Sequence, residues 1–398
     1  MESDLIRECV MAPISTAELE RRWKATREVM KAEKVDFLLM QNNNDYLGGY
    51  VKWFTDLPAV NGYPVTVIFP LSDEMTTVSH GPSDPEKAVP AAWLLRGVKK
   101  RISNPIMLSL NFTSTYQAEN VVEELKGYKN CRISFLNEGA IPAGFTQYVR
   151  THLSGATFAD ITDKIDEIKA VKSPEEIEHI RYTAYIHDQA MKACIESIRP
   201  GIREFEIAAA ARSKCMSLGC IQHFLLMGSS PAGTAFARVS PVHAMNRPLR
   251  YGDQSGILIE ASGPSGMWTH IYRIVCIGKV TDELRKMFED AKELQSLAAG
   301  MLKPGADPMD ITNMANDFLR SRGYPEETRL FAHSQGYDCV ERPSFQPGET
   351  MKIKAGMNIG IHPWIPGERA CGRICDNYIV TESGVEYLSQ TPREIFVV

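Results

Sequence analysis

Residues 198–202 read Ile-Arg-Pro-Gly-Ile, and residues 302–306 read Leu-Lys-Pro-Gly-Ala, so a similar turn occurs at two places in the chain. Six pairs of identical residues share one offset of 104 positions: Pro200 and Pro304, Gly201 and Gly305, Ile207 and Ile311, Gly219 and Gly323, Gly252 and Gly356, Ile257 and Ile361. Pro-Gly pairs are common in turns, so one match alone would carry little weight. Six matches indicate an internal repeat, and two copies favour a pseudo-twofold domain over a solenoid. We expect residues 180–275 and 284–380 to form two similar halves, each of two helices followed by strands, with the functional site between them.

The first part of the chain has a different pattern, in which helical and strand-like segments alternate. A helical spacing of apolar residues begins near Thr16 and continues to about Lys34. Four segments have the apolar character of buried strands: 35–40, 64–70, 74–79 and 133–136. Such alternation is typical of an α/β domain. The sequence therefore predicts an amino-terminal α/β domain over residues 1–165 and a second domain over residues 166–398.

Composition and charge exclude several classes of protein. The chain has 44 Lys and Arg against 49 Asp and Glu, a net charge of −5, and no basic run, so we expect no binding to nucleic acid. Its apolar stretches are far shorter than the roughly 18 to 20 residues of a membrane span. The first residues lack the features of a secretory signal, and nine scattered cysteines suit reduced thiols. These features predict a cytoplasmic protein without a membrane partner.

Several segments resemble the creatinase, aminopeptidase P and prolidase superfamily and follow one another in that superfamily's order. The segment Ile168–Glu178 resembles the opening of its catalytic domain. The later matching segments are His243, Leu258–Gly278, His333–Pro343, Met357–Pro363 and Ile374–Glu382. The resemblance implies an α/β (α+β) architecture, with a creatinase-type amino-terminal domain and a pita-bread catalytic domain that contains the pseudo-twofold repeat. It also implies a homodimer, because in this family the partner's amino-terminal domain usually completes the pocket.

The resemblance locates five metal-ligand positions. The metallopeptidases of the superfamily hold two divalent metals with Asp, Asp, His, Glu and Glu, and the matching positions here are Glu260, His270, His333, His362 and Asp376. Two neighbouring dications need several carboxylates to neutralise and bridge them, and imidazole cannot bridge as a carboxylate does. We therefore expect no dinuclear centre and, as the leading interpretation, no cofactor. The alternative is one Zn or Fe ion held by two or three histidines and a carboxylate.

Four residues form the predicted catalytic set: His243, Glu260, His333 and His362. Creatinase hydrolyses a C–N bond without metal through a histidine whose position His243 matches, and imidazole exchanges protons near neutral pH; the alternative is a structural loop histidine. Glu260 ends the apolar run 256–259 and is expected to reach the pocket as base, anchor or nucleophile, or to form an ion pair with Arg273 or a histidine. His333 and His362 are expected to stabilise a developing oxyanion.

Four further residues are predicted to contact the substrate: Trp268, Arg273, Glu341 and Trp364. The two tryptophans flank His270 and His362 and are candidates for cation–π contact with a cationic group, with a place in the core or dimer interface as the alternative. The residues that bind guanidinium in creatinase are replaced here by Tyr272 and His362, so creatine is not the expected substrate.

The leading functional hypothesis is a creatinase-like hydrolase that cleaves a C–N bond of a small cationic or zwitterionic metabolite. The alternatives are a mononuclear metallohydrolase or Xaa-Pro-type metallopeptidase, a lyase of the dimethylsulfoniopropionate type, and a non-catalytic binding protein. Val340 stands where the peptidases use a second histidine, which argues against peptidase chemistry. The lyase keeps the metal carboxylates that are lost here.

Overall fold

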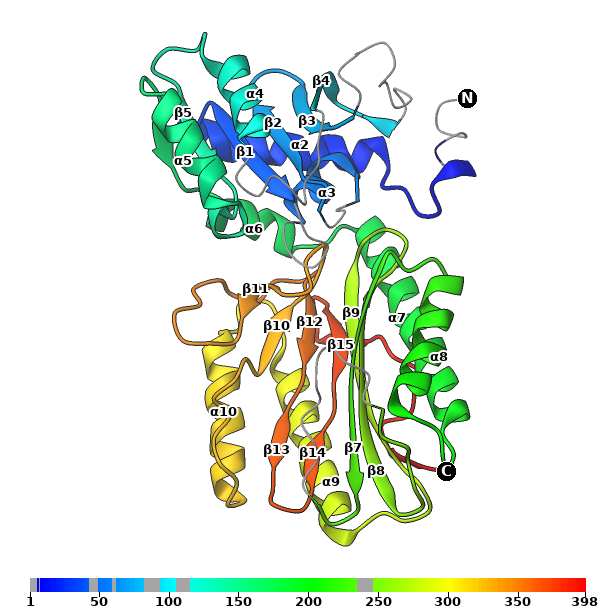
Figure 1. Ribbon diagram of the computed structural model, residues 1–398. Helices are drawn as coiled ribbons and strands as arrows, with labels where there is room; N and C mark the ends of the chain where they lie inside the picture. Colours follow the sequence, from blue (N-terminus) through cyan, green and yellow to red (C-terminus); the bar gives the residue numbers. More distant parts are fainter. Residues whose placement is uncertain are drawn as a thin grey trace. The chain divides into compact units, whose positions relative to one another are not determined.

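The computed structural model describes residues 6, 8–42, 49–58, 62–81, 94–104, 115–234 and 246–398. The chain divides into two compact units, Met1–Lys169 and Ala170–Val398. This division lies four residues after the boundary predicted from the sequence. Each unit combines helices with a sheet, so the predicted mixed α/β class is confirmed (Figure 1).

The amino-terminal unit is built on a six-stranded sheet in the order β4-β3-β2-β1-β5-β6. Its strands are β1 (Phe37–Asn42), β2 (Val65–Pro70), β3 (Met75–His80), β4 (Val98–Asn104), β5 (Arg132–Phe135) and β6 (Thr157–Ala159). The four predicted strands correspond to β1, β2, β3 and β5. The sequence did not reveal β4, whose residues are mostly polar and incompletely buried, or β6, which has only three residues.

The helices of this unit are α2 (Thr16–Ala32), α3 (Tyr50–Thr55), α4 (Tyr116–Leu125), α5 (Ala143–His152) and α6 (Thr162–Ala170). The helix predicted from Thr16 is confirmed, and the side chain of Ser15 caps it by accepting from the Glu18 amide at 3.1 Å. Val121 of α4 and Val149 of α5 are fully buried in a cluster with Leu39 of β1. Helices α4 and α5 therefore cover the sheet through apolar contacts.

The carboxyl-terminal unit contains the repeat. Its first half comprises α7 (Pro174–Ser197), α8 (Glu204–Ser217), β7 (Gln222–Pro231), β8 (Asp253–Ser262) and β9 (Trp268–Cys276). Its second half comprises α9 (Asp282–Met301), α10 (Pro308–Ser321), β10 (Ala332–Ser334), β11 (Glu341–Ser344), β12 (Asn358–Ile361), β13 (Trp364–Pro366), β14 (Cys371–Arg373) and β15 (Asp376–Val380). The short strands β16 (Val385–Tyr387) and β17 (Ile395–Val397) follow. Two helices precede the strands in each half, as predicted.

The correspondence between the halves extends to single hydrogen bonds. Helix α8 has the bounds of α10 when it is shifted by 104 residues. The amide of Gly201 donates to the Leu249 carbonyl, and the amide of Gly305 donates to the Ile353 carbonyl, which is the same bond at the same offset. Both glycines have left-handed backbones, with φ of 90° and 87°. The repeated glycine is therefore required by a turn that residues with a Cβ adopt only with strain.

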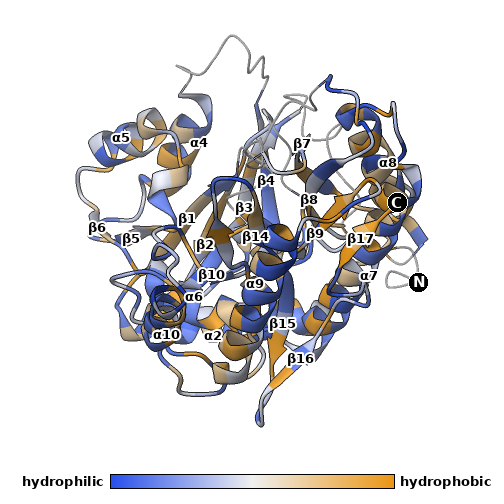
Figure 2. Ribbon diagram, turned by 90° about the horizontal axis from the view of Figure 1, so that it is seen from below, coloured by the Kyte–Doolittle hydropathy of each residue, from blue (hydrophilic) through white to orange (hydrophobic). Residues whose placement is uncertain are grey.

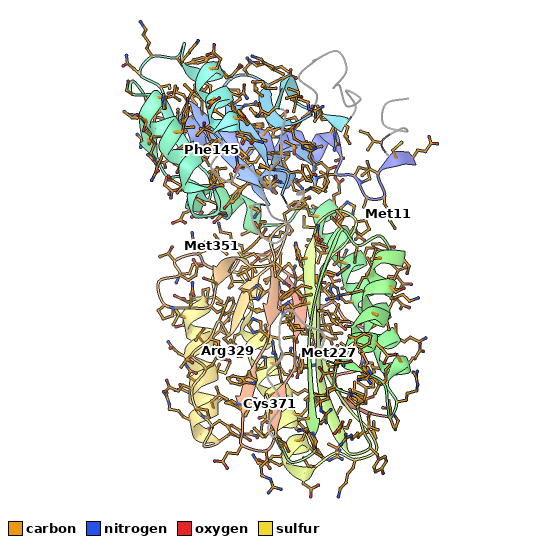
Figure 3. All side chains as sticks on the ribbon, in the orientation of Figure 1. Met11, Phe145, Met227, Arg329, Met351 and Cys371 are labelled. Carbon is orange, nitrogen blue, oxygen red and sulfur yellow. The ribbon has the colours of Figure 1, made fainter. Side chains whose placement is uncertain are left out.

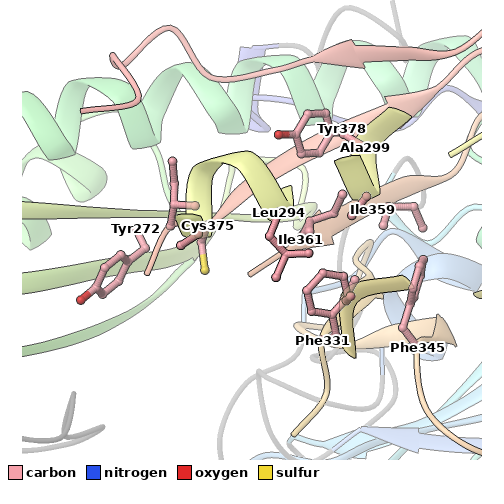
Figure 4. Packing of buried hydrophobic residues seen from close by; sticks show 14 of the residues in the cluster. Tyr272, Leu294, Ala299, Phe331, Phe345, Ile359, Ile361, Cys375 and Tyr378 are labelled. Carbon is pink, nitrogen blue, oxygen red and sulfur yellow. The ribbon is translucent and has the colours of Figure 1, made fainter. Parts of the chain in front are cut away.

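The two halves are joined at the middle of the unit. A four-stranded sheet in the order β17-β9-β8-β7 belongs mainly to the first half, and a five-stranded sheet in the order β11-β10-β12-β15-β16 belongs to the second. An isolated antiparallel bridge between Tyr272 and Cys375 connects β9 to the start of β15. Both residues lie in a large apolar cluster together with Ile361 and Phe331 (Figure 4).

Helices α9 and α10 show how the sequence directs this packing. Each has hydrophobic and hydrophilic residues on different sides, visible as mixed colouring in Figure 2. Leu294 of α9 and Ile311 of α10 are fully buried in the apolar cluster.

None of the helices in the described ranges combines the length and apolar character needed to cross a membrane.

The repeated turn yields a first prediction. Gly201→Ala and Gly305→Ala should each lower the free energy of unfolding by about 1–2 kcal/mol, because an L-residue at these φ values is strained. A Cβ at either position meets no atom within 4 Å, so steric collision does not contribute. Urea unfolding of the two variants would measure the effect.

The matched control is Gly300→Ala in α9, where an added Cβ also meets nothing and φ is not positive. Alanine has the higher helix propensity, so this variant should be unchanged or more stable by up to about 1 kcal/mol. Equal losses at all three positions would show that the left-handed turn is not the cause.

Candidate metal and hydrolase site

Three predicted site residues meet in the carboxyl-terminal unit. Glu260, His270 and His333 are buried and each offers a ligand atom within 4.8 Å of the others. Glu260 on β8 lies directly opposite His270 on β9, so the two side chains share one face of the sheet. His333 comes from β10 in the second half of the repeat. The cluster therefore lies where the halves meet, as the repeat predicted.

A third imidazole, that of His362, completes the group. Its ring centroid lies 5.1 Å from that of His333 and 5.6 Å from that of His270, and its Nδ1 atom is buried without a hydrogen-bond partner. Space for His270 is provided by Gly360 on β12, where a Cβ would approach the imidazole Cε1 to 2.1 Å. A larger residue at position 360 would therefore displace His270.

Hydrogen bonds fix the orientation of two members of the cluster. The buried amide of Gln335 donates from Nε2 to Glu260 Oε1 at 2.9 Å and faces His270 Nδ1 with its Oε1 at 2.7 Å. The side-chain oxygen of Asn377 accepts from the main-chain amide of His270 at 2.9 Å. Gln335 and Asn377 were not predicted as site residues, because nothing in the sequence around them distinguishes them from other amide residues. Only the fold brings them to the cluster.

The same bonds settle which imidazole nitrogen carries the proton. Amide oxygens and carbonyls only accept, so His270 donates from Nδ1 to Gln335, and His333 donates from Nδ1 to the Ser334 carbonyl at 2.9 Å. Each ring then has its lone pair on Nε2. For His270, that Nε2 atom is buried and has no hydrogen-bond partner. Two neutral imidazoles thus present the form that a metal ligand requires.

Burial determines the protonation of the cluster. Desolvation lowers the pKa of His270 to about 3 and that of His333 to about 4, and it lowers the pKa of His362 well below the usual value. Desolvation raises the pKa of Glu260 to about 7, against opposing effects that include the charge of Arg373. The imidazoles are therefore neutral at physiological pH, as metal coordination demands.

This donor set fits a single metal ion. Two imidazole nitrogens and one carboxylate are the ligands of many catalytic Zn sites and of non-haem Fe(II) sites, in which further positions stay open. The expectation of a pocket without any cofactor is therefore not supported, while the alternative of one Zn or Fe ion matches the ligands present. A dinuclear centre does not fit, since Glu260 is the one carboxylate that the described residues bring to this cluster.

Asp376, the fifth predicted ligand, does not face the cluster. Its carboxylate accepts from Arg273 at 2.8 Å and from the Tyr387 hydroxyl at 3.1 Å, and Arg273 and Asp376 are both fully buried. Side chains alternate along a strand, so Cys375 and Asn377 share the opposite face, on which Asn377 reaches Gln335. Cys375 therefore occupies the site-facing position, and the assignment of a metal ligand to Asp376 is wrong by one residue.

The predicted substrate-binding residues are engaged elsewhere. Arg273 pairs with Asp376, and Glu341 accepts from Lys172 at 2.7 Å in a second buried ion pair. The side chain of Trp268 is 1% exposed and belongs to the core. The guanidinium of Arg329, labelled in Figure 3, lies 4.7 Å from the ring centroid of Trp364, so this ring makes a cation–π contact with a residue of its own chain, whereas the predicted partner was a cationic substrate group. A substrate role for Arg273, Glu341 and Trp268 is therefore not supported, whereas that of Trp364, which is only partly buried, stays a prediction.

His243, the predicted proton-transfer residue, lies outside the described residues. Its role stays a prediction from the resemblance.

The fold and this cluster define the class of protein: a pita-bread fold with a candidate metal site where its two repeated halves meet. A comparison with family models matches residues 178–382 to metallopeptidase family M24. The chain belongs to this family, which confirms the predicted superfamily. Peptidases hydrolyse C–N bonds, so the predicted enzyme class is also confirmed at that level.

Similar curated proteins include Xaa-Pro dipeptidases and relatives named as uncharacterised peptidases. The "Uncharacterized hydrolase/peptidase y4tL" of Sinorhizobium fredii is 27% identical over 396 residues and covers 96% of this chain and 97% of the relative. The Xaa-Pro dipeptidase of Pyrococcus furiosus is 25% identical over 272 residues and covers 65% of this chain and 74% of its own.

Solved structures share the fold over nearly the whole chain. The prolidase from Pyrococcus horikoshii OT3 has a TM-score of 0.78 at 20% identity, over 94% of this chain and 99% of that chain. The recombinant prolidase from Thermococcus sibiricus has a TM-score of 0.80 at 19% identity, over 97% of this chain and 100% of that chain. The pita-bread fold is therefore confirmed.

A second prediction separates the roles of Asp376 and His270. Asp376→Asn should lower the free energy of unfolding by about 3–5 kcal/mol, because it leaves the Arg273 charge buried without its partner. It should not change the amount of metal bound by the folded protein. His270→Ala should instead abolish metal binding. Urea unfolding and metal analysis of both variants would check this, and loss of metal from folded Asp376→Asn protein would restore Asp376 as a ligand.

A third prediction concerns acid stability of the metal-free protein. Unfolded histidine titrates near 6.5, whereas folded His333 titrates near 4 and folded His270 near 3, so between these values the unfolded chain binds more protons. The free energy of unfolding should therefore fall as pH decreases from about 6.5 to 4, by up to about 1.4 kcal/mol per pH unit for each group.

Glu260 opposes this trend, since its folded pKa near 7 lies above the unfolded value and folded protein gains protons first. Several histidines outweigh one carboxyl group, so the net change is a loss. Urea unfolding at pH 7.5, 6.5, 5.5 and 4.5 would measure the slope, and His333→Gln should make it shallower. A stability that rises steadily toward pH 4.5 would contradict the buried neutral imidazoles.

Proposed function

We propose that this protein is a mononuclear metal-dependent hydrolase of C–N bonds in a small substrate. The observation that carries the proposal is the convergence of Glu260 with the Nε2 lone pairs of two neutral imidazoles, those of His270 and His333. A divalent ion held in this way acts as a Lewis acid toward a carbonyl oxygen at neutral pH. Membership of the M24 family and the peptidase names of the relatives support C–N hydrolysis.

The protein's own residues contribute position and hydrogen bonds. Gln335 holds the Glu260 carboxylate and the His270 ring in fixed directions, so neither group has to reorganise when substrate arrives. His362 lies beside the other two rings and keeps Nδ1 without a partner, so its imidazole is available to a substrate atom. We assign His362 the role of hydrogen-bonding the oxygen that becomes negative in the transition state. His243 remains the candidate for proton transfer.

The Xaa-Pro dipeptidase activity named for the relatives is not the leading assignment for this chain. Of the five family ligand positions, two hold His270 and His362 in place of carboxylates. A third holds Cys375, since the neighbouring Asp376 is paired with Arg273 on the other face. A single positive centre tolerates this donor set, whereas two adjacent dications would repel each other without a bridging carboxylate. We therefore retain the hypothesis from the sequence analysis that the substrate is a small molecule with a hydrolysable C–N bond.

A second candidate is the metal-free, creatinase-like hydrolase predicted first. Its support is the pKa of Glu260, which desolvation raises to about 7. A carboxyl group with such a pKa can act as general acid or base near neutrality. In that case Glu260 would move a proton or attack the substrate, and the histidines would bind it.

Metal content decides between the two candidates, and this is the fourth prediction. Protein purified without added metal or chelator should contain close to one equivalent of Zn or Fe, and chelation should remove both the metal and the hydrolysis of a panel of small amides and Xaa-Pro dipeptides. Glu260→Gln should lower kcat by about 10²–10⁴-fold, as loss of a positioned catalytic group does. Full activity with less than about 0.1 equivalent of any metal would favour the creatinase-like mechanism, and two equivalents would favour a dinuclear peptidase.

A further inference from the structure

Three buried amide side chains lie in a row behind the metal-ligating cluster. Asn377 is on β15, Asn358 is on the neighbouring strand β12, and Gln335 directly follows the next strand, β10. Their exposed fractions are 3%, 0% and 0%. Buried polar groups are costly unless they are hydrogen-bonded, so the partners of this row decide whether it stabilises one arrangement.

Every polar atom in the row has a partner. Asn377 donates from Nδ2 to Gln335 Oε1 at 2.9 Å and to Asn358 Oδ1 at 2.8 Å. Asn358 donates from Nδ2 to the main-chain carbonyls of Trp268 and Gln335, at 3.2 and 3.1 Å. Gln335 donates from Nε2 to Glu260 and to the Cys339 carbonyl, both at 2.9 Å. The network is fully satisfied.

Main-chain carbonyls give this network a single direction. A carbonyl can only accept, so the amide nitrogen of Asn358 must point toward the Trp268 carbonyl, and that of Gln335 toward the Cys339 carbonyl. The oxygen of Asn358 then requires a donor from Asn377, and the oxygen of Gln335 requires donors from Asn377 and from His270 Nδ1. If the side-chain oxygen and nitrogen of any one of these amides exchanged places, two acceptors or two donors would face each other and their hydrogen bond would be lost.

We propose that the row Asn358–Asn377–Gln335 fixes the His270 tautomer and the Glu260 orientation, so that His270 Nε2 and the carboxylate are set to receive one metal ion. Gln335 is thus a positioning residue, acting through His270 and Glu260. The metal part of this inference rests on the proposed function. The tautomer part stands independently of it, since it follows from the hydrogen bonds of the metal-free protein.

Two variants interrupt the row in different ways. Gln335→Met keeps the approximate volume and removes all four side-chain hydrogen bonds. Asn377→Asp keeps the shape and the acceptor for the His270 amide, but it places an oxygen opposite the oxygens of Gln335 and Asn358. The control is Gln254→Met, at a buried glutamine 1% exposed on the same strand as Glu260, six residues away and so about 20 Å along β8.

Two readouts are measured on the full-length chain. The first is the affinity for Co(II), with its visible spectrum, determined by titration of metal-free protein. Partners of metal-ligating histidines typically contribute 10–100-fold to metal affinity, so both variants should bind Co(II) 10–100-fold more weakly and Gln254→Met should bind like wild type. The second is the histidine-ring ¹⁵N NMR spectrum at one pH, in which metal-free wild type should show His270 protonated at Nδ1 and Asn377→Asp should show a changed tautomer population.

The outcomes separate the two levels of the proposal. If Gln335→Met does not fold, the isosteric Asn377→Asp variant carries the test alone. Wild-type Co(II) affinity and an unchanged His270 tautomer in the folded variants would overturn the positioning role. If wild type binds no Co(II) but its His270 tautomer is Nδ1-protonated and changes in Asn377→Asp, the proposed metal function fails while the positioning role stands.

Discussion

The main-chain bridge between Tyr272 and Cys375 is the constraint on which the site depends. It joins the last strand of the first half to the last large strand of the second, and the buried Arg273–Asp376 ion pair lies next to it. Because side chains alternate along both strands, the bridge assigns His270 and Asn377 to the face of the site and Arg273 and Asp376 to the other face. One register therefore separates the residues that hold the fold from those that form the cluster.

This separation explains how the site departs from a dinuclear centre without loss of the fold. The ion pair of Arg273 and Asp376 maintains the junction of the halves, and it requires no metal. The site face is then free to carry imidazoles in place of carboxylates. The buried amides beside these imidazoles carry no charge, but each must find hydrogen-bond donors and acceptors in the interior. The row ending at Gln335 meets that requirement.

The electrostatics of the cluster follow from the same burial. Desolvation keeps the imidazoles neutral and raises the pKa of Glu260 to about 7, so in the metal-free protein the cluster carries little net charge. A cation would favour the ionised carboxylate and the neutral rings together. Protonation, folding and the proposed metal binding would thereby be linked through three side chains contributed by both halves of the repeat.

The sequence by itself determined the fold class, the repeat and most members of the cluster. The 104-residue offset can be detected in the sequence because left-handed turns and helix ends require particular residues at particular positions, as at Gly201 and Gly305. Glu260, His270 and His333 were predicted as site residues from the resemblance of their segments to the superfamily, carried over position by position. Only the tertiary structure decided on which face of its strand each side chain lies and which residues it hydrogen-bonds. A shift of one residue moves a side chain to the other face of a strand, so Asp376 was assigned to the site in place of its neighbour Cys375. The amides of Gln335, Asn358 and Asn377 have no local signature, because their role arises from hydrogen bonds between strands that are far apart in the chain.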